Sequence, residues 1–254
     1  MERNFVYILG EFARALPDTE LYLGRELVWT LTPVAMPVFN SVAAARLDSR
    51  NVEAAIAAAQ ERARRKGVPL LWWVFPGNEP ADLSRRLLAN GFRLTERSPG
   101  MSLDLGNAGE LARPGGAISI ALVDGATAPR WCEVFSDGFG LARKFGEAYL
   151  PFAMDVAAKP DGSLRNYALY SSGQMVATAS LALHAGIAGI YNVATLPHAR
   201  GNGFASALTA HVACEGRASG ATVAALQASE MGLGVYRRLG FRERYTVDML
   251  TWPG

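Results

Sequence analysis

Cysteine and histidine are scarce in this chain of 254 residues, and their scarcity excludes several classes of protein. Cys132 and Cys214 are the only cysteines, which excludes a disulfide-stabilised fold and an all-cysteine metal cluster. With only three histidines in the sequence, we do not expect a multi-histidine metal site. The sequence therefore predicts no bound metal.

Long apolar runs and an excess of one charge are also missing. No stretch of about 18 consecutive apolar residues occurs, so we expect no transmembrane helix. Lysine and arginine number 25 against 23 aspartates and glutamates, and a net charge of +2 gives no electrostatic reason to expect nucleic acid or a membrane as partner. The N-terminus lacks the pattern of a signal peptide, so we expect a cytoplasmic location with reduced thiols.

The composition is that of a globular protein, with 50% apolar and 19% charged residues. Domains of about 100–150 residues are the commonest, so this length fits one large domain or two small ones. Glycine and proline gather at residues 106–116, where charged residues are sparse, as in a linker. We therefore expect one domain at residues 1–106 and a second at residues 117–254.

The N-terminal half alternates helical and strand patterns. Its clearest helix is 51–66, where Val52 and Ala63 belong to one apolar stripe and Gly67 fits the position after the last turn. The apolar run at 70–75 has the length of a buried strand. The other elements expected here are helices at 4–15 and 80–88 and extended segments at 27–32 and 92–105.

The C-terminal half shows a fuller series of elements. Two consecutive hairpins are indicated at 165–195, because the turn residues Ser172-Gly173 and Ala185-Gly186 separate segments rich in strand-forming residues. The other elements expected here are strands at 117–123, 222–228 and 241–250 and helices at 129–139, 145–157, 203–217 and 233–239. This alternation predicts an α/β fold with a mixed sheet.

A short segment occurs twice in the sequence. Arg-Arg-Leu-Leu-Ala-Asn-Gly-Phe-Arg at 85–93 resembles Arg-Arg-Leu-Gly-Phe-Arg at 237–242, and each copy follows a strand and a short helix. Joints of helix, glycine and strand often look alike, which is one interpretation. The other is a duplicated unit whose first copy has decayed.

Residues 191–205 carry the most informative pattern, a strand and a turn followed by the start of a helix. Gly201 and Gly203 stand where the helix begins, and glycine lets the backbone approach a ligand closely. The first N–H groups of a helix have no partner within it and carry partial positive charge, so such a corner binds phosphate oxygens without a lysine. The pattern matches neither a phosphate loop with Gly-Lys-Ser/Thr nor a three-glycine dinucleotide turn.

Arg200, Gly203 and Ala205 resemble the Arg-x-x-Gly-x-Ala pyrophosphate pattern of the GNAT superfamily of acyl-CoA-dependent N-acyltransferases. A second segment resembles the next motif of that family, since a strand ends at Leu226-Gln227-Ala228-Ser229 and is followed by Tyr236 and Leu239-Gly240-Phe241. The resemblance covers about residues 117–250. It implies a GNAT fold, with a C-terminal catalytic domain preceded by a smaller, degenerate GNAT-like unit.

The resemblance also implies which residues bind acetyl-CoA as co-substrate. They are the end of a strand, a turn with the start of the following helix, and one later serine: Val193, Ala194, Thr195, Arg200, Gly201, Asn202, Gly203, Phe204, Ala205, Ser206 and Ser229. A backbone N–H at 193–195 could polarise the thioester carbonyl. Ser229 stands where many relatives carry Asn, which leaves its contact open.

Tyr236 is the candidate catalytic residue, facing the sulfur in the arrangement that the resemblance implies. Expulsion of a thiolate, whose thiol has a pKa near ~8.5, can be assisted by a phenol that stays protonated below about pH 10. The alternative is that the Tyr236 ring only packs in a core between helix and sheet.

The base that deprotonates the amine is not identified by the sequence. The candidate carboxylates are Asp137, Glu133, Glu147 and Glu230, and a solvated surface group is the favoured interpretation of each. His198 adjoins the turn and would flank the phosphates, His211 lies near an apolar helix stripe, and His184 ends a hairpin strand.

The N-terminal half has no Arg-x-x-Gly-x-Ala turn and no tyrosine matching Tyr236, so we expect that it does not bind CoA in this way. We interpret it as a degenerate unit that packs on the catalytic domain and could wall the substrate cleft. Trp72 and Trp73 face opposite sides of a strand, so one could reach a cleft, although burial of both is the favoured interpretation.

The leading hypothesis is an N-acetyltransferase that moves an acetyl group from acetyl-CoA to a primary amine, with a small molecule favoured over a peptide or protein. Direct attack in a ternary complex is expected, because neither cysteine is placed to form an acyl-enzyme. The alternatives are a non-catalytic acyl-CoA-binding module and a scaffold protein. A homodimer is left open.

Overall fold

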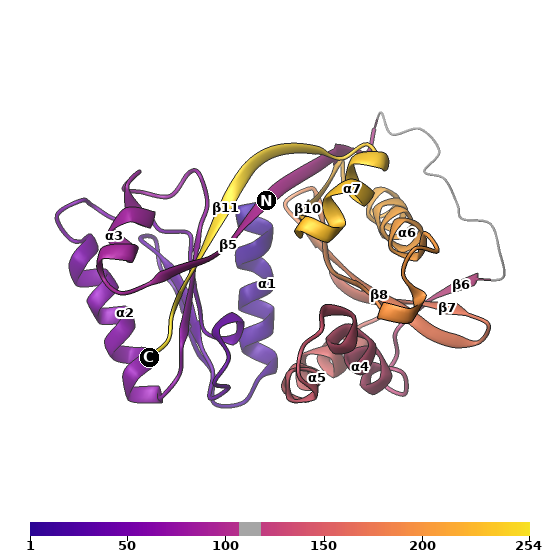
Figure 1. Cartoon of the computed structure of the whole chain (residues 1–254), viewed down its shortest axis with the longest axis horizontal. Helices are drawn as coiled ribbons and strands as arrows, with labels where there is room; N and C mark the ends of the chain where they lie inside the picture. The colour runs from indigo at the N-terminus through magenta and orange to yellow at the C-terminus, as the bar shows by residue number, and fades with distance from the viewer. Residues whose placement is uncertain (107–117) are drawn as a thin grey trace. The chain divides into compact units, whose positions relative to one another are not determined.

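The computed structural model describes residues 1–106 and 118–254 (Figure 1). Apart from Gly106, the expected linker at 106–116 lies outside the described residues. The chain divides into two compact units. We call Glu2–Gly100 with Arg244–Gly254 the N-terminal unit, and Met101–Glu243, to which Met1 is also assigned, the C-terminal unit.

The N-terminal unit has the strand order β1-β2-β3-β4-β11-β5. Its elements are α1 (Glu2–Ala15), β1 (Glu20–Leu23), β2 (Val28–Leu31), the 3-10 helix η1 (Pro37–Phe39), β3 (Ser41–Ala43), α2 (Val52–Lys66), β4 (Leu70–Val74), α3 (Leu83–Ala89) and most of β5 (Arg93–Asp104) and β11 (Arg242–Trp252). β3 and β4 are parallel, whereas β1–β2, β2–β3 and β4–β11 are antiparallel. Helices cover both faces, α2 and α3 on one side and α1 on the other (Figure 1).

Both adjacent tryptophans, Trp72 and Trp73, are buried in the core of the N-terminal unit. Trp72 is fully buried among the apolar side chains that α2 and α3 cover. Trp73 faces the other way, with its ring 4.6 Å from that of Phe5 and its Nε1 donating to Ser41 Oγ at 3.1 Å. Both side chains are therefore core residues, which confirms the favoured interpretation. The left-handed Gly67 that ends α2 was also predicted.

The C-terminal unit has the strand order β5-β10-β9-β8-β7-β6. Its further elements are β6 (Ile118–Leu122), α4 (Ala128–Phe139), α5 (Arg143–Ala157), β7 (Leu164–Ser171), β8 (Gln174–His184), β9 (Ile187–Thr195), the 3-10 helix η2 (Pro197–Ala199), α6 (Phe204–Ala218), β10 (Val223–Gln227) and α7 (Glu230–Arg238). β9 and β10 are parallel, and the pairs β6–β7, β7–β8 and β8–β9 are antiparallel. Figure 1 shows α6 and α7 on one side of these strands and α4 and α5 on the other.

The two predicted hairpins are confirmed. Ser172 and Gly173 have φ of +49° and +75°, and Ala185 and Gly186 have φ of +52° and +74°. Two successive positive φ angles match the right-handed twist of the flanking strands. These turns fix the pairing register of β7, β8 and β9.

The element order of the C-terminal unit repeats that of the N-terminal unit. The series β1-β2-β3-α2-β4-α3-β5 corresponds to β7-β8-β9-α6-β10-α7-β11, with matching parallel and antiparallel pairs. Gly91 and Gly240, in the repeated sequence segment, are both left-handed joints between helix and strand. This correspondence supports the duplication interpretation over a chance similarity of joints.

The last strand of each repeat pairs outside its own series. β11 pairs with β4 and contributes Arg244–Gly254 to the N-terminal unit, while β5 neighbours β10 and contributes its residues from Met101 onward to the C-terminal unit. Residues 244–254, which we had expected within the second domain, therefore group with the first. The two compact units divide within β5 and β11, and no division falls at residues 106–116.

Two absences hold for residues 1–106 and 118–254. None of the helices there is long and apolar enough to cross a membrane. Nor do these residues contain a group of three or more His, Cys, Asp or Glu that could hold a metal ion.

Candidate functional site

The site begins where two parallel strands part. β9 and β10 pair only along residues 187–189 and 223–225, yet β9 continues to Thr195 and β10 to Gln227. On its other edge β9 stays paired with β8 up to Thr195. The last part of β9 therefore has one edge that no described strand covers, and its backbone groups there can bind a ligand.

A β-bulge lies at the start of this uncovered edge. Tyr191 pairs with Ser180 and Ala194 pairs with Thr178, so Asn192 and Val193 together oppose Ala179. Asn192 has a φ of +54°, in the left-handed region that asparagine adopts more readily than most residues. A bulge of this kind bends the strand and leaves a backbone group out of the ladder.

The turn after β9 has the geometry expected of an anion-binding corner. Gly201 and Gly203 have φ of +80° and +76°, and a Cβ at either position would meet no atom within 4 Å. Gly203 is the N-cap of α6, so the first N–H groups of that helix lie beside this open space. The turn can therefore hold phosphate oxygens on backbone N–H groups and the helix dipole.

Two polar side chains of the turn are directed to backbone carbonyls. Arg200 donates from Nη2 to Gly138 O at 2.9 Å and from Nε to Thr195 O at 3.3 Å. Asn202 donates to Ala199 O at 3.1 Å and to Arg200 O at 3.2 Å. Both side chains thus brace the turn.

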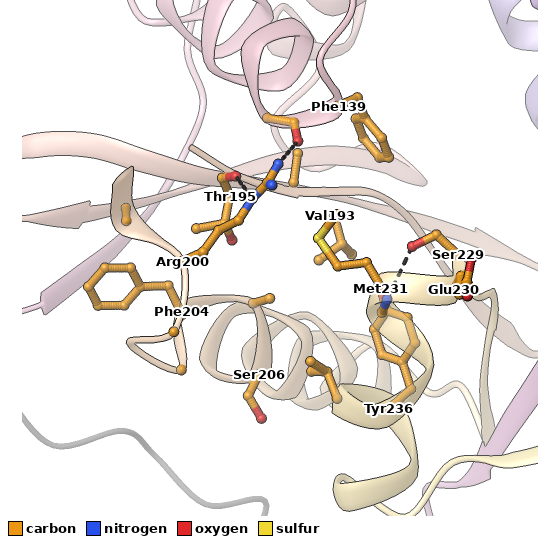
Figure 2. A pocket seen from close by; sticks show the side chains of 18 of the residues that line it. Phe139, Val193, Thr195, Arg200, Phe204, Ser206, Ser229, Glu230, Met231 and Tyr236 are labelled. Carbon is orange, nitrogen blue, oxygen red and sulfur yellow. Dashed lines mark hydrogen bonds between the residues drawn. The ribbon is translucent and has the colours of Figure 1, made fainter. Parts of the chain in front are cut away.

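A cavity of about 900 Å³ joins these features. Every predicted cofactor-binding residue except Asn202 lines it, as does Tyr236 (Figure 2): Val193, Ala194, Thr195, Arg200, Gly201, Gly203, Phe204, Ala205, Ser206 and Ser229. Ligand cavities typically measure about 300–1,000 Å³, so the size suits an extended small molecule.

Tyr236 projects from α7 into this lining and is 7% exposed. Its ring lies edge-on to that of Phe241, with the centroids 6.1 Å apart, and its hydroxyl end lies close to Gly232. Burial raises the pKa of Tyr236 to about 12, so the phenol stays protonated at physiological pH. Core packing and access to the cavity are combined in this one side chain.

Ser229 has a definite structural task. Its Oγ accepts from Gly232 N at 3.2 Å and so caps α7, while the residue also lines the cavity. The side chain is therefore already engaged at the position where many relatives carry Asn.

Of the candidate bases, Glu230 lines the cavity. The other three carboxylates are outside its lining, and Glu133 and Glu147 pair with arginines on their own helices, Arg130 at 2.8 Å and Arg143 at 3.1 Å. His211 packs against Tyr167 with ring centroids 5.3 Å apart, which fits the interpretation of a packing residue. His198 lies in η2 and His184 at the end of β8, and neither lines the cavity.

Sequence reasoning missed several residues of the lining. Gly138 and Phe139 come from the end of α4, where a Cβ on Gly138 would lie only 2.8 Å from that of Ala194. The glycine therefore lets α4 close over the end of β9. Met231 and Arg238 come from α7, the helix that carries Tyr236, and their spacing of seven residues, which puts them on one helix face, was the available signal.

The site fits an acyl-CoA on three observations: the open turn at the start of α6, the uncovered edge of β9, and a cavity that joins both. The turn would hold the pyrophosphate, and the backbone at 193–195 would pair with the amide-bearing pantetheine arm. Such an arm needs backbone donors and acceptors along an extended edge, which the parting of β9 from β10 supplies.

Comparisons with known proteins agree with this geometry. A family model described as an acetyltransferase (GNAT) domain matches residues 171–244. The structure is similar to that of a GCN5-related N-acetyltransferase from Kribbella flavida, with a TM-score of 0.76 and 20% identity over 98% of this chain and 95% of that chain. No curated protein matches the chain.

Two further solved structures show the same fold. A GCN5-related N-acetyltransferase from Sphaerobacter thermophilus has a TM-score of 0.66 and 19% identity over 91% of this chain and 82% of that one. A tandem GNAT protein from the clavulanic acid biosynthesis pathway has a TM-score of 0.62 and 16% identity over 98% and 94%. Residues 171–244 therefore match a GNAT acetyltransferase domain, and the chain has a GNAT fold with an extra N-terminal unit.

Proposed function

We propose that this acyltransferase moves an acetyl group from acetyl-CoA to the nitrogen of a primary amine. The single observation that carries the proposal is the open anion-binding turn at Gly201 and Gly203, which opens into the same cavity as the uncovered edge of β9. The turn recognises a pyrophosphate and the strand edge recognises an amide-bearing arm. A thioester at the end of that arm supplies an activated acyl group.

The residues of this chain would divide the reaction among them. Backbone groups at Val193, Ala194 and Thr195 hold the arm, and an N–H among them polarises the thioester carbonyl. The amine nitrogen attacks the carbonyl carbon, the carbon–sulfur bond breaks, and the sulfur leaves with the bonding electron pair. Tyr236 donates a hydrogen bond toward that sulfur, and the thiolate then takes a proton from solvent.

The raised pKa of Tyr236 shapes this role. A phenol of pKa about 12 is a weaker acid than a thiol of pKa near ~8.5, so complete proton transfer in the resting site is uphill by about 5 kcal/mol. Tyr236 therefore acts mainly by donating a hydrogen bond as negative charge grows on the sulfur. Glu230, the candidate base that lines the cavity, would take the proton that the amine loses.

A small-molecule amine is the proposed acceptor, and a peptide or protein amine is the second choice. The sequence has no acidic or basic tract that would suggest recognition of a charged protein tail. Acceptor attack is direct, because Cys132 is buried in α4 and neither cysteine lines the cavity.

Thermal unfolding with acetyl-CoA, followed by turnover, tests the proposal. A ligand at a hundred times its dissociation constant stabilises the folded state by about 2.7 kcal/mol. We expect a rise in Tm with acetyl-CoA, and then release of free thiol when a panel of primary amines is added. Stabilisation without thiol release from any amine would favour a non-catalytic acyl-CoA-binding module, and no stabilisation at all would favour a scaffold protein.

A further inference from the structure

A chain of partly buried hydrogen bonds holds the β9 bulge. Asn192 Nδ2 donates to Tyr149 Oη at 2.8 Å and to Ser180 Oγ at 3.0 Å. Ser180 Oγ in turn donates to Asn166 Oδ1 at 2.6 Å, and Thr178 Oγ1 donates to Asn192 O at 2.9 Å. The bulge is thereby tied to α5, β8 and β7 at once.

The Asn192 amide and the Ser180 hydroxyl each donate to an acceptor in this chain. Ser180 accepts from Asn192 and donates to Asn166, while the Tyr149 oxygen accepts from the same amide. An amide with both of its N–H groups engaged cannot rotate without losing a partly buried hydrogen bond, which is costly away from water. Asn192 is therefore held in a single orientation.

Tyr149 is an immobile anchor for this amide. Its ring lies among those of Phe135 at 5.1 Å, Phe152 at 5.4 Å and Trp131 at 6.1 Å between centroids. Burial raises the pKa of Tyr149, so its hydroxyl stays neutral. An aromatic group packed on several sides has little freedom to shift its oxygen.

We infer that Asn192 and Tyr149 are positioning residues, which hold the backbone of Val193 in the orientation that acyl transfer requires. This inference rests on the proposed function. Neither side chain lines the cavity, whereas Val193, the second residue of the bulge, does. The hydrogen-bond chain therefore reaches the reacting atoms only through the backbone that it braces.

The left-handed backbone and the amide of Asn192 are separable contributions. Glycine adopts a φ of +54° readily, so Asn192→Gly keeps the bulge accessible and removes only the amide. Tyr149→Phe keeps the aromatic packing and removes only the hydroxyl that the amide contacts. Both variants break the same hydrogen bond from opposite ends.

Turnover of the full chain with acetyl-CoA and a responsive amine is the first measurement. A small misplacement of a reacting group can cost about a hundredfold in rate, so we expect each variant to lose ten- to hundredfold in kcat. Acetyl-CoA affinity should change less than about twofold, because the pyrophosphate turn is untouched. The double variant should lose little more than the worse single variant, since the bond is shared.

Hydrogen exchange over residues 190–196 is the second measurement and needs no activity. We expect faster exchange there in Asn192→Gly and Tyr149→Phe. Tyr167→Phe is the matched control, because Tyr167 is also buried in the C-terminal unit and its hydroxyl contacts Glu215 at 3.4 Å, away from the bulge. That control should change neither readout.

The two measurements separate the two claims. If the wild-type chain releases no thiol with any amine, the proposed function fails, and the exchange data alone decide whether the bulge is braced. Unchanged exchange in both variants would overturn the bracing, and unchanged kcat in a wild-type-active enzyme would overturn the positioning role. Additive losses in the double variant would also contradict a shared bond.

Discussion

The parallel strand pairs β9–β10 and β3–β4 occupy equivalent places in the two repeats but differ in what lies beyond their paired residues. In the C-terminal unit, the pair parts after three matched positions and leaves a cavity lined by the backbone of β9. In the N-terminal unit, the pair is shorter still, with Ser41 against Leu71 and Val42 against Trp72, but the chain itself fills the space beyond it.

The filling segment is the loop after β4. Glu79 N donates to Ala45 O at 3.0 Å and Leu47 N donates to Glu79 O at 3.1 Å, and an isolated bridge pairs Arg46 with Glu79. Asn78 adds a side-chain acceptor for Phe75 N at 3.0 Å. The two backbone bonds of Glu79 use the strand edge that corresponds to the one that β9 leaves uncovered.

The difference teaches that one fold can bind a ligand or close on itself through backbone hydrogen bonds alone. An uncovered strand edge needs a partner, and either a pantetheine-like arm or a loop of the chain can supply it. The N-terminal unit lacks the two-glycine turn, and its own loop at residues 78 and 79 occupies the corresponding strand edge. It keeps the GNAT succession of elements without the opening.

The largest expected effect comes from closing the open corner, with Gly203→Glu. A side chain at a φ of +76° would enter the space beside the α6 N-terminus, and its carboxylate would repel a phosphate. We expect acetyl-CoA binding to be abolished, measured by calorimetry and by the loss of ligand-induced stabilisation.

Gly173→Glu is the matched control for that variant. Gly173 also has a positive φ, of +75°, with no atom within 4 Å of an added Cβ, but it lies in the β7–β8 turn outside the cavity. Both variants carry the same backbone strain and the same added charge. Equal acetyl-CoA affinity in the two folded variants would remove the turn from the binding site.

Removing the Tyr236 hydroxyl is expected to have the next largest effect. Tyr236→Phe keeps the ring against Phe241 and removes the donor, and general acid catalysis is worth about 10²–10⁴-fold. Because the phenol pKa is about 12, we expect a loss in kcat near the lower end, about a hundredfold, with acetyl-CoA affinity nearly unchanged.

The pH dependence gives an independent check on Tyr236. Its phenol should remain protonated until the pH approaches about 12, so it should add no falling limb to kcat between pH 7 and 10. A Tyr236→Phe variant that keeps most of its turnover would reassign Tyr236 to packing. In the N-terminal repeat, Leu87 stands four residues before Gly91, whereas in the C-terminal repeat Tyr236 stands four residues before Gly240.

Much of the fold was predictable because its signals are local. The helix expected at 203–217 is found as Phe204–Ala218, and the second hairpin, expected to end at residue 195, ends there with β9. β3 was missed because three fully buried residues show no alternation, and β1 because its side chains are mostly exposed. The pairing of β11 with β4 joins segments far apart in the sequence, and no local pattern encodes it.

The candidate site was predictable only where a motif marks it. The turn and Tyr236 follow from short patterns, and the structure gathers them in one cavity. Phe139 and the bulge at Asn192 carry no such pattern, since their positions depend on how α4 and β8 pack against β9. The closed edge of the N-terminal unit likewise depends on a loop conformation that composition does not reveal.

A core truncation in the N-terminal unit should separate stability from binding. Trp72 is fully buried, and replacing a buried Trp by Ala typically costs about 3–5 kcal/mol. We expect Trp72→Ala to lower the free energy of unfolding by about that amount while the folded fraction binds acetyl-CoA with unchanged affinity. Chemical denaturation and calorimetry measure the two quantities.

Two further variants keep that test informative. Trp72→Phe should fold even if Trp72→Ala does not, with a smaller loss of stability. Trp29→Ala removes a half-buried ring whose centroid lies 5.2 Å from Arg62 Cζ. This variant should lower the free energy of unfolding by less than Trp72→Ala does. A fall in acetyl-CoA affinity in any of these folded variants would contradict the assignment of binding to the C-terminal unit alone.

The smallest effect is expected at Arg200, although its charge and its motif position suggest a large one. In both repeats an arginine follows the parallel strand and bonds backbone carbonyl groups, Arg200 to Gly138 O at 2.9 Å and Arg46 to Ala45 O at 2.8 Å. Because the Arg200 guanidinium is already engaged, backbone N–H groups and not this side chain would hold the phosphates. A hydrogen bond from a charged group contributes about 1.5–3 kcal/mol, and losing it here would destabilise the turn. We therefore expect Arg200→Gln to lower Tm and to weaken acetyl-CoA binding only severalfold, with the salt dependence of the dissociation constant unchanged. A direct ion pair with the phosphates would instead make the variant's binding markedly less sensitive to salt than that of the wild type.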